Sequence, residues 1–345
     1  MIAQKQLGSA WNRLFETGRV LRLAWKEQRE CIADVHARLV PYLAAPPDTP
    51  PEYAVHADPI PSSAYTWRKN MFSSLFHAVY LLTGVSPVRR ALYGRLIHLY
   101  RIWVVSADNL LDDEDKPVVP IAMPGQSRVM RQVVALMAAD RVLAELLAEN
   151  AAEGIVTAQQ ARDLSRDSLC RLLPSAAQEA SEEGGIEVRP DPEHVLNVIH
   201  RLKTGLLFNL AFAAPERVEA GPFGQDGAGL KDALMEFGLG CQLLDDVRDM
   251  ARDLRERRHN YVLSWLAANR PEMLDALGAS ISPFSDRLYL EVREAALPAA
   301  RRGFAMMRDG LARLGRAGLG CDETDAEQMA RMMFEVLDIP ELCIP

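Results

Sequence analysis

The sequence predicts an all-α fold, and three observations support it: its composition, the residues that delimit its helices, and two aspartate-rich helical segments. Ala, Leu, Arg and Glu, which favour helices, dominate the 345 residues. The alternating Val, Ile and Thr runs that are typical of strands are nearly absent. In "LLTGVSPVRR", Gly84 ends one helix, Ser86 caps the next and Pro87 takes its first position. Asp191 and Pro192 begin another helix in the same way, and we expect about a dozen helices in all.

The domain organisation is predicted from breaks in the helical pattern. Residues 1–44 form an N-terminal helical segment that we expect to pack on the main body. Residues 45–63 carry six prolines and form a linker, because proline interrupts regular helix. Residues 64–345 form the main domain, in which further breaks fall at 183–190 and 214–229. The sequence shows no repeat with a period of about 20–50 residues, so we do not expect a helical solenoid.

Composition and charge exclude several classes of function. The net charge of −8 and the lack of a basic stripe argue against nucleic-acid binding. The five cysteines are scattered without a CxxC pair, which argues against a disulfide framework or a zinc site and fits a cytoplasmic protein. The N-terminus lacks the apolar core of a signal peptide. No stretch approaches the roughly 18 apolar residues of a membrane span.

The first aspartate-rich segment is "SADNLLDDEDK", residues 106–116. Asp108, Asp112 and Asp115 lie at i, i+4 and i+7, directly after the apolar run "IWVV". Like charges at this spacing destabilise a helix by roughly 0.2–0.5 kcal/mol per pair. One interpretation is an acidic helix end in water. The other is a site at which a divalent cation relieves the repulsion.

The second aspartate-rich segment, residues 236–253, favours the cation. In "EFGLGCQLLDDVRDMARD", Asp245, Asp249 and Asp253 lie at i, i+4 and i+8 and share one helix face, with Asp246 beside them. Mg²⁺ is typically held by one or two carboxylates together with substrate phosphates. Two such segments, both following apolar helix, therefore predict a cluster of Mg²⁺ ions that binds a diphosphate. In "HRLKTGLLFNL", Lys203 supplies a further cation for that diphosphate.

These three segments resemble a known family, the class I isoprenoid synthases, and most closely their trans-polyprenyl diphosphate synthase branch. That branch carries a DDxxD motif, a Lys-Thr pair and an FQxxDDxxD motif, in this order. The corresponding stretches are "DNLLD" (108–112), "KTG" (203–205) and "CQLLDDVRD" (241–249), and the likeness covers about residues 60–265. The resemblance implies a helical bundle around a deep apolar cavity, with the two Asp-rich helices facing each other at its mouth.

The resemblance also implies which residues act. About two or three Mg²⁺ ions would be bound by the aspartates of both motifs, namely Asp108, Asp112, Asp245, Asp246, Asp249 and Asp253. Catalysis would rest on Asp108, Asp112, Lys203, Gln242, Asp245, Asp246 and Asp249. An allylic prenyl diphosphate would contact Lys203, Thr204, Gln242, Arg248, Arg258, Tyr261, Trp103 and Phe208. His200 and His259 are expected to be ordinary helix-surface residues. The oligomeric state stays open, with a homodimer as one expectation.

Departures from the family pattern shape the functional prediction. Asn109 stands where the family has its second aspartate, so that Asp113 or Asp115 are alternative ligands, and Cys241 replaces the phenylalanine of FQ. Arg68 and Lys69 stand where elongating members carry GGKxxRP. The Arg pair that follows the first motif in those members has no counterpart in "KPVVPIAMPGQSR". In the family these elements bind isopentenyl diphosphate, so the site for a second substrate is weakened here.

We therefore predict a Mg²⁺-dependent class I terpene synthase, which ionises one allylic diphosphate and releases pyrophosphate. In the polyprenyl family the position five residues before the first motif sets the depth of the cavity, so the resemblance implies that the bulky Trp103 selects a substrate of roughly ten to twenty carbons. The alternative is a trans-prenyltransferase that adds isopentenyl diphosphate to an allylic diphosphate. Two further alternatives are a head-to-head synthase, which "RDMARDLRERRHNY" (248–261) resembles, and a catalytically silent partner subunit.

Overall fold

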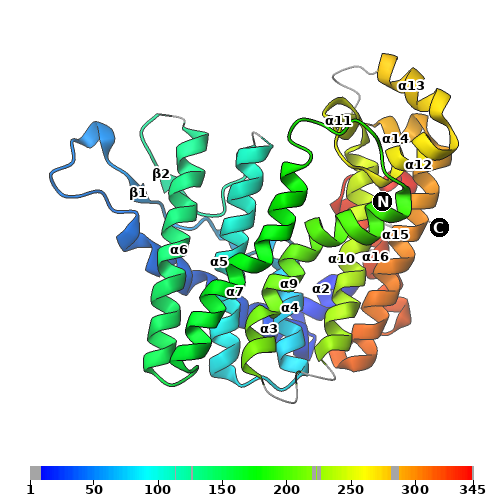
Figure 1. Cartoon of the computed structure of the whole chain (residues 1–345). Helices are drawn as coiled ribbons and strands as arrows, with labels where there is room; N and C mark the ends of the chain where they lie inside the picture. Colours follow the sequence, from blue (N-terminus) through cyan, green and yellow to red (C-terminus); the bar gives the residue numbers. More distant parts are fainter. Residues whose placement is uncertain are drawn as a thin grey trace. The chain divides into compact units, whose positions relative to one another are not determined.

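The computed structural model describes residues 9–112, 114–125, 127–219, 223, 227–280 and 287–343, and these are almost entirely helical (Figure 1). The prediction of an all-α fold is confirmed. The chain divides into two compact units, and two of the boundaries between them fall inside helices α7 (Ala158–Ala180) and α9 (His200–Val218). The N-terminal unit comprises residues 18–170 and 209–228, and the C-terminal unit comprises residues 1–17, 171–208 and 229–345. Residues 9–17 and 18–44, predicted to form one segment, therefore fall in different units.

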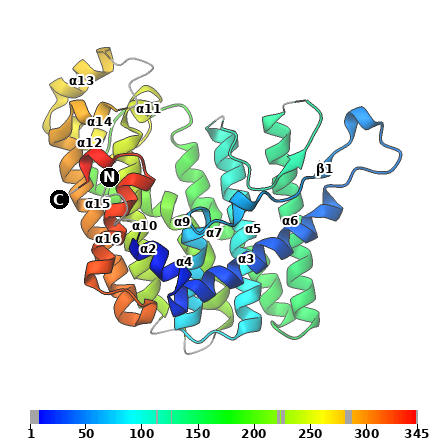
Figure 2. The ribbon, with the colours of Figure 1, turned by 180° about the vertical axis from the view of Figure 1, so that it is seen from behind.

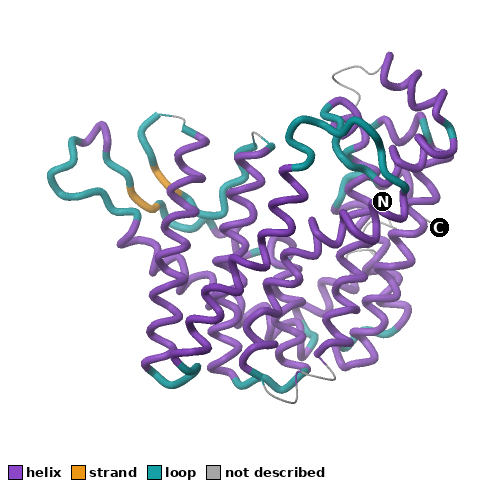
Figure 3. The backbone as a smooth tube through the Cα atoms, viewed as in Figure 1, coloured by secondary structure: helices purple, strands orange, loops and turns teal. Residues whose placement is uncertain are grey.

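The N-terminal unit is built from long helices. They are α3 (Arg19–Leu39), α4 (Met71–Leu82), α5 (Pro87–Leu111), α6 (Arg128–Ala152), the first part of α7 (Ala158–Ala180) and the last part of α9 (His200–Val218). Short 3₁₀ turns at Val40–Tyr42, Pro51–Tyr53, Ser62–Tyr65 and Arg68–Asn70 replace regular helix in and beside the proline-rich segment. Two short strands, β1 (His56–Ala57) and β2 (Ile121–Ala122), pair antiparallel, with His56 opposite Ala122 (Figure 3).

The C-terminal unit contains the remaining helices. They are α2 (Ser9–Glu16), α8 (Pro192–His194), α10 (Ala228–Arg248), α11 (Met250–Arg255), α12 (Tyr261–Asn269), α13 (Pro271–Ser280), α14 (Leu288–Glu291), α15 (Arg293–Leu314) and α16 (Glu323–Val336). Single π-helical turns at Val195–Ile199 and Gly315–Leu319 follow α8 and α15, and a 3₁₀ turn at Pro340–Leu342 follows α16. None of the described helices has the length and apolar character needed to cross a membrane.

The helix boundaries follow the residues that predicted them. Gly84 adopts a positive φ of 71° after α4, and α5 begins at Pro87 with Ser86 in the cap position. The Asp191 side chain accepts a hydrogen bond from the backbone N–H of Glu193 and caps α8. The Asp191 side chain thus satisfies a backbone N–H that a helix end leaves without a partner, whereas the Ser86 side chain makes no capping hydrogen bond.

In the N-terminal unit, α3 runs across α4, α5 and α6 (Figure 2). A buried ion pair fixes this crossing: both carboxylate oxygens of Glu27 accept hydrogen bonds from the Arg90 guanidinium, at 2.9 and 2.7 Å. The imidazole of His77 lies 2.6 Å from the same carboxylate. Burial alone would raise the pKa of Glu27, but Arg90 and His77 outweigh it and lower that pKa to about 2.

In the C-terminal unit, α10 and α15 pack side by side through paired glycines (Figure 1). A Cβ on Gly303 would lie 2.8 Å from the carbonyl oxygen of Gly240, and one on Gly240 would lie 2.6 Å from that of Gly303. Such distances are shorter than van der Waals contact, so the backbones approach too closely for any side chain. Trp11 of α2 donates a hydrogen bond of 3.1 Å to the carbonyl of Met329 and anchors the first described helix on α16.

We expect Gly303→Ala to destabilise the protein by about 1–3 kcal/mol, because the new methyl group must push α10 and α15 apart. Gly278 in α13 is the matched control, since a Cβ there would meet no atom within 4 Å. Gly278→Ala should be neutral or stabilising by up to about 1 kcal/mol through helix propensity. Chemical denaturation of both variants measures the difference. If Gly303→Ala unfolds at the same denaturant concentration as Gly278→Ala, then α10 and α15 can move apart at Gly303 without loss of stability.

Candidate functional site

The first aspartate-rich segment lies at the end of α5, in the N-terminal unit. Asp108 is exposed in the last turn, and Asp112 follows the helix with its backbone N–H bonded to the Asp108 carbonyl at 2.8 Å. Asp115 does not continue the helical spacing, because α5 ends at Leu111. Its carboxylate instead pairs with Arg131, at 3.2 Å. The predicted i, i+4, i+7 stripe is therefore wrong at its third member, and Asp113 lies outside the described residues.

Asn109 explains why the helix ends there. Its side chain is 4% exposed, and its amide exchanges two hydrogen bonds with the backbone of Lys116. Nδ2 donates to the Lys116 carbonyl at 3.3 Å, and Oδ1 accepts from the Lys116 N–H at 3.2 Å. The backbone N–H of Glu114 bonds to the Asn109 carbonyl at 3.0 Å. Asn109 thus closes the loop that follows α5, a role that requires both a donor and an acceptor.

Restoring the family's aspartate by Asn109→Asp should destabilise the protein by about 1–3 kcal/mol. A carboxylate cannot donate to the Lys116 carbonyl and would place a buried negative charge against it. Asn269→Asp is the control, because the Asn269 amide also donates to a backbone carbonyl, that of Trp265 at 2.9 Å, but is exposed. Urea denaturation should separate the two variants. Equal midpoints would mean that the Asn109 amide does not hold the loop.

The second aspartate-rich segment spans the end of α10 and the start of α11, in the C-terminal unit. Asp249 sits at a short break between the two helices, with φ −89° and ψ 6°. Helical i→i−4 hydrogen bonds nevertheless continue across the break. The N–H of Asp249 bonds to the Asp245 carbonyl at 2.8 Å, and the N–H of Asp253 bonds to the Asp249 carbonyl at 2.9 Å. The predicted alignment of the three aspartates is therefore carried by two consecutive helices.

Two arginines of the same segment lie among these carboxylates. Arg248 approaches Asp245 at 2.9 Å and Asp249 at 2.7 Å, and Arg252 approaches Asp249 at 3.1 Å. Burial raises the pKa of Asp245 to about 6 and that of Asp253 to about 7. The hydrogen bond to Asp249 raises the pKa of Arg248. The arginines thus offset part of the repulsion that the sequence pattern indicates.

Asp246, the neighbour of Asp245, faces the interior of the C-terminal unit and is 4% exposed. One of its carboxylate oxygens accepts from the backbone N–H of Tyr261 at 2.6 Å and lies 2.9 Å from the His200 ring. The other accepts from the Gln242 amide at 3.2 Å, and the Thr204 hydroxyl donates to Gln242 at 2.6 Å. The fold therefore brings together Thr204, Gln242 and Asp246, as one chain of hydrogen bonds.

Asn260 ties this chain to the last aspartate of the segment. Its amide donates to the Asp246 carbonyl at 2.6 Å and to the Asp253 carboxylate at 2.8 Å. The same side chain accepts from the N–H of Leu263 and caps α12 at 3.1 Å. Asn260 is fully buried, so it fixes the chain that follows α11 against the end of α10.

Lys203 lies in a buried acidic pair rather than in open solvent. Its ammonium group is 3.4 Å from Glu179 and 3.2 Å from Glu182. Glu182 also accepts a hydrogen bond of 2.8 Å from the backbone N–H of His259. Burial would lower the pKa of Lys203, but the two carboxylates outweigh it and raise that pKa. Burial in turn raises the pKa of Glu179.

Of the other predicted substrate contacts, Tyr261 and Arg258 lie after the second aspartate segment. The Tyr261 hydroxyl accepts from Arg302 at 2.9 Å, and Arg302 also binds Glu193. The Arg258 guanidinium lies 2.7 Å from Glu256. Both side chains are therefore held by partners within the C-terminal unit.

Phe208 and Trp103 belong to different packing clusters. The ring of Phe208 covers Gly238 of α10 and is 3% exposed. Trp103 of α5 packs its ring on Tyr100 of the same helix, with centroids 5.7 Å apart. Each aromatic side chain is thus part of the hydrophobic packing of its own unit.

The solved structures most informative for this arrangement are polyprenyl synthases. A polyprenyl synthase from Caulobacter crescentus CB15, complexed with calcium and isoprenyl diphosphate, matches with a TM-score of 0.52, 14% identity and coverage of 94% of this chain and 97% of that chain. The chain has the polyprenyl synthase fold. A geranylgeranyl pyrophosphate synthetase from the archaeon Geoglobus acetivorans matches with a TM-score of 0.51, 14% identity and coverage of 92% and 99%.

A decaprenyl diphosphate synthase from Rhodobacter capsulatus also shares the fold, with a TM-score of 0.51, 16% identity and coverage of 94% and 99%. No protein-family model and no curated protein matches the sequence. The likeness thus confirms the predicted isoprenoid synthase fold.

Whether a polyprenyl synthase site for Mg²⁺ fits this chain depends on its donor atoms. Within the described residues, no three or more His, Cys, Asp or Glu side chains are already gathered around one point as metal ligands. Asp245 and Asp249 nevertheless present carboxylate oxygens, which are the donors that Mg²⁺ prefers, and both pair with arginines of the same segment. The donor set fits the ion.

Sequence reasoning missed three residues of this region. His200, expected at a helix surface, is 1% exposed and faces Asp246, so that expectation is wrong. Glu179 and Glu182, the partners of Lys203, were not considered as part of the site. The available signal was an acidic run, "EASEEGG", directly before a helix break in an otherwise amphipathic segment.

Proposed function

We propose that the protein is a Mg²⁺-dependent prenyltransferase, which joins an allylic diphosphate to isopentenyl diphosphate. The fold supports prenyl diphosphate chemistry, since the matched proteins are named as polyprenyl, geranylgeranyl and decaprenyl synthases. This reverses the preference drawn from the sequence, in which the terpene synthase came first. The observation that carries the reversal is a partly buried cation in the N-terminal unit, Arg101.

Arg101 is held by a neutral residue. Its Nη1 donates to the Asn70 side-chain oxygen at 2.8 Å. The Asn70 amide in turn donates to the carbonyls of Ala64 and Thr66, at 2.7 and 2.9 Å. Among the described residues no carboxylate forms an ion pair with Arg101, and burial lowers its pKa. A guanidinium so placed is stabilised by binding an anion.

The position of Arg101 favours a diphosphate as that anion. Arg101 precedes Asp108 by seven residues, two turns of α5, so both lie on the same side of this helix. Arg68 and Lys69 directly precede Asn70 and add positive charge to the segment that binds Arg101. In this proposal Arg68, Lys69 and Arg101 supply the positive charge that the GGKxxRP motif provides in the elongating members of the family. We assign them to the diphosphate of isopentenyl diphosphate.

In the proposed reaction, the C–O bond of the allylic diphosphate breaks and pyrophosphate leaves with the bonding electrons. The double bond of isopentenyl diphosphate attacks the carbocation, and a proton passes to the pyrophosphate. Asp108, Asp112, Asp245 and Asp249 would hold Mg²⁺, which when bound stabilises the charge that develops on the leaving group. Asp246, Gln242 and Thr204 would position the end of α10, and Lys203 would neutralise part of the diphosphate.

The second candidate is the terpene synthase, and a specific observation favours it. Neither the glycines and RP of GGKxxRP nor the later Arg pair is present in the sequence. An enzyme without a second substrate would eliminate a proton from the carbocation or cyclise it.

One experiment separates the two functions. The protein is incubated with Mg²⁺ and geranyl, farnesyl or geranylgeranyl diphosphate, with and without isopentenyl diphosphate, and the products are identified by mass spectrometry. Longer diphosphates that form only with isopentenyl diphosphate support the prenyltransferase. Hydrocarbon or alcohol from the allylic substrate alone supports the terpene synthase. Absence of pyrophosphate release under every condition contradicts both.

The variant Arg101→Gln tests whether Arg101 binds the diphosphate of isopentenyl diphosphate. It should raise the KM for isopentenyl diphosphate by at least about tenfold, because one charge-assisted hydrogen bond is lost. The KM for the allylic substrate should stay unchanged. Arg22→Gln, at an exposed position of α3, is the control. Equal effects of Arg101→Gln on both KM values would assign Arg101 to packing.

A further inference from the structure

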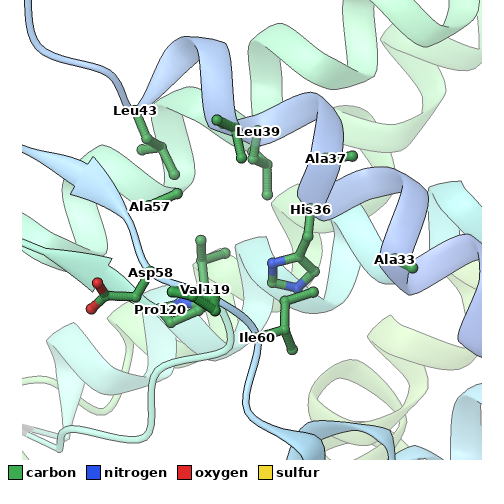
Figure 4. A pocket seen from close by; sticks show the side chains of 12 residues that line it. Ala33, His36, Ala37, Leu39, Leu43, Ala57, Asp58, Ile60, Val119 and Pro120 are labelled. Carbon is green, nitrogen blue, oxygen red and sulfur yellow. The ribbon is translucent and has the colours of Figure 1, made fainter.

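A pocket in the N-terminal unit lies apart from every residue assigned above. It has a volume of about 190 Å³ and opens between α3, the segment that contains β1, and the residues before β2 (Figure 4). Its walls are mainly apolar and include Leu39, Leu43, Ile60, Val119 and Pro120. Asp58 also borders it, but Figure 4 shows the Asp58 carboxylate directed away from the pocket, and this carboxylate lies 3.5 Å from the His56 ring.

The polar group that reaches into this pocket is His36. Its imidazole projects from α3 into the space between Ile60 and Val119 (Figure 4). The residue is 8% exposed, and its Nε2 lies 3.1 Å from Nε2 of His98, which is itself 3% exposed. Within the described part of the chain this is the hydrogen bond that His36 makes, so its Nδ1 is left for the pocket. Burial lowers the pKa of His36 to about 4 and also lowers the pKa of His98 well below its usual value, so both rings are neutral at pH 7.

The pair of imidazoles determines which atom of His36 carries the proton. One Nε2 must donate and the other accept. If His36 donated, His98 would carry its proton on Nδ1, which has no hydrogen-bond partner among the described residues. A buried N–H without an acceptor costs more than a lone pair without a donor. His98 therefore donates from Nε2, and His36 carries its proton on Nδ1, toward the pocket.

We propose that this pocket binds a small neutral molecule with a compact hydrocarbon body and one hydrogen-bond acceptor, such as a carbonyl or ether oxygen, which receives the Nδ1–H of His36. The size follows from the volume: benzene fills an engineered cavity of about 150 Å³, so the ligand has about six to ten non-hydrogen atoms. The apolar walls would leave a carboxylate or phosphate poorly solvated, which excludes anions.

The first test reads the tautomers directly. Nitrogen-15 chemical shifts of labelled histidine distinguish a protonated ring nitrogen from a bare one in the full-length protein. We expect protonated Nδ1 and bare Nε2 in His36, and the reverse in His98. A bare Nδ1 in His36 would overturn the proposal, because the pocket would then offer an acceptor.

The second test measures binding with matched probes. Cyclohexanone and methylenecyclohexane have the same shape, but only the ketone accepts a hydrogen bond. Ligand-observed NMR should show the ketone bound about tenfold more tightly, the value of one hydrogen bond, and cyclohexanecarboxylate not bound. Equal affinity of the first two probes, or tighter binding of the carboxylate, contradicts the proposal.

Two variants localise the binding. His36→Phe keeps an aromatic ring but removes the donor, and should abolish the preference for the ketone. Ala37→Leu, at the rim of the pocket on α3, should weaken both probes by filling the space without altering the imidazole pair. Ala158→Leu, at an exposed position of α7 outside the pocket, is its control. If Ala37→Leu and Ala158→Leu bind the ketone equally, the probe is bound elsewhere.

Discussion

Asp245→Asn should reduce Mg²⁺-dependent pyrophosphate release by at least about 10²-fold, the magnitude found when one preorganised electrostatic group is removed from an active site. Asparagine has nearly the volume of aspartate, so packing at the end of α10 is preserved. What is lost is one negative charge beside Arg248. Without it the segment would hold Mg²⁺ less tightly, while Arg248 would keep its ion pair with Asp249.

Asp309→Asn is the matched control for this variant. Asp309 lies on α15 in the same unit, is 51% exposed and is likewise paired with a neighbouring arginine, Arg308. Its neutralisation should leave turnover within about twofold of the wild-type value. Pyrophosphate release is measured over a Mg²⁺ titration for both variants. Near-normal turnover of Asp245→Asn at low Mg²⁺ would remove Asp245 from the metal site.

The contrast between Asp245 and Asp246 shows what helical periodicity predicts and what it does not. Successive residues on an α-helix point about 100° apart, so two adjacent aspartates cannot share one environment. Asp245 stays partly exposed, with 31% of its side chain accessible, and pairs with Arg248. Asp246 turns inward and accepts hydrogen bonds from Gln242 and Tyr261. The sequence motif treats both as ligands, and this stays a prediction; the hydrogen bonds show that Asp246 also links α10 to the residue that begins α12.

Features fixed by neighbouring residues were the ones that could be predicted. The helix that begins at Pro87 follows from local capping, and the alignment of Asp245 with Asp249 follows from spacing. The end of α5 at Leu111 was missed, because it depends on the Asn109 side chain bonding the backbone of a loop seven residues away. Sequence spacing carries no information on such a side-chain bond.

Contacts between residues that are distant in the sequence could not be predicted either. His200 meets Asp246 across 46 residues, and nothing in the local pattern of either helix indicates the contact. The pairing depends instead on how α9 packs on α10 within the C-terminal unit. The same holds for Arg101, whose hydrogen bond to the neutral Asn70 side chain becomes visible only when the surrounding side chains are placed.

Glu182→Ala should destabilise the protein by about 1–3 kcal/mol, because it removes one of the two carboxylates that pair with Lys203 and leaves a backbone N–H without its acceptor. Glu182 has 3% of its side chain exposed and lies 3.2 Å from the Lys203 ammonium. Its removal leaves the partly buried Lys203 with Glu179, at 3.4 Å, and leaves the backbone N–H of His259 without its acceptor. The loop after α7 and the loop after α11 would lose their connection through this side chain.

The adjacent Glu183 gives a closely matched control, because it is exposed at the same helix end. Glu183→Ala should change the free energy of unfolding by less than about 0.5 kcal/mol. Glu182→Gln should fall between the two, since its oxygen can still accept from His259 while the charge opposite Lys203 is gone. Guanidinium denaturation of the three variants ranks them. If Glu182→Ala and Glu183→Ala unfold at the same midpoint, the ion pair between Lys203 and Glu182 does not contribute to the stability of the protein.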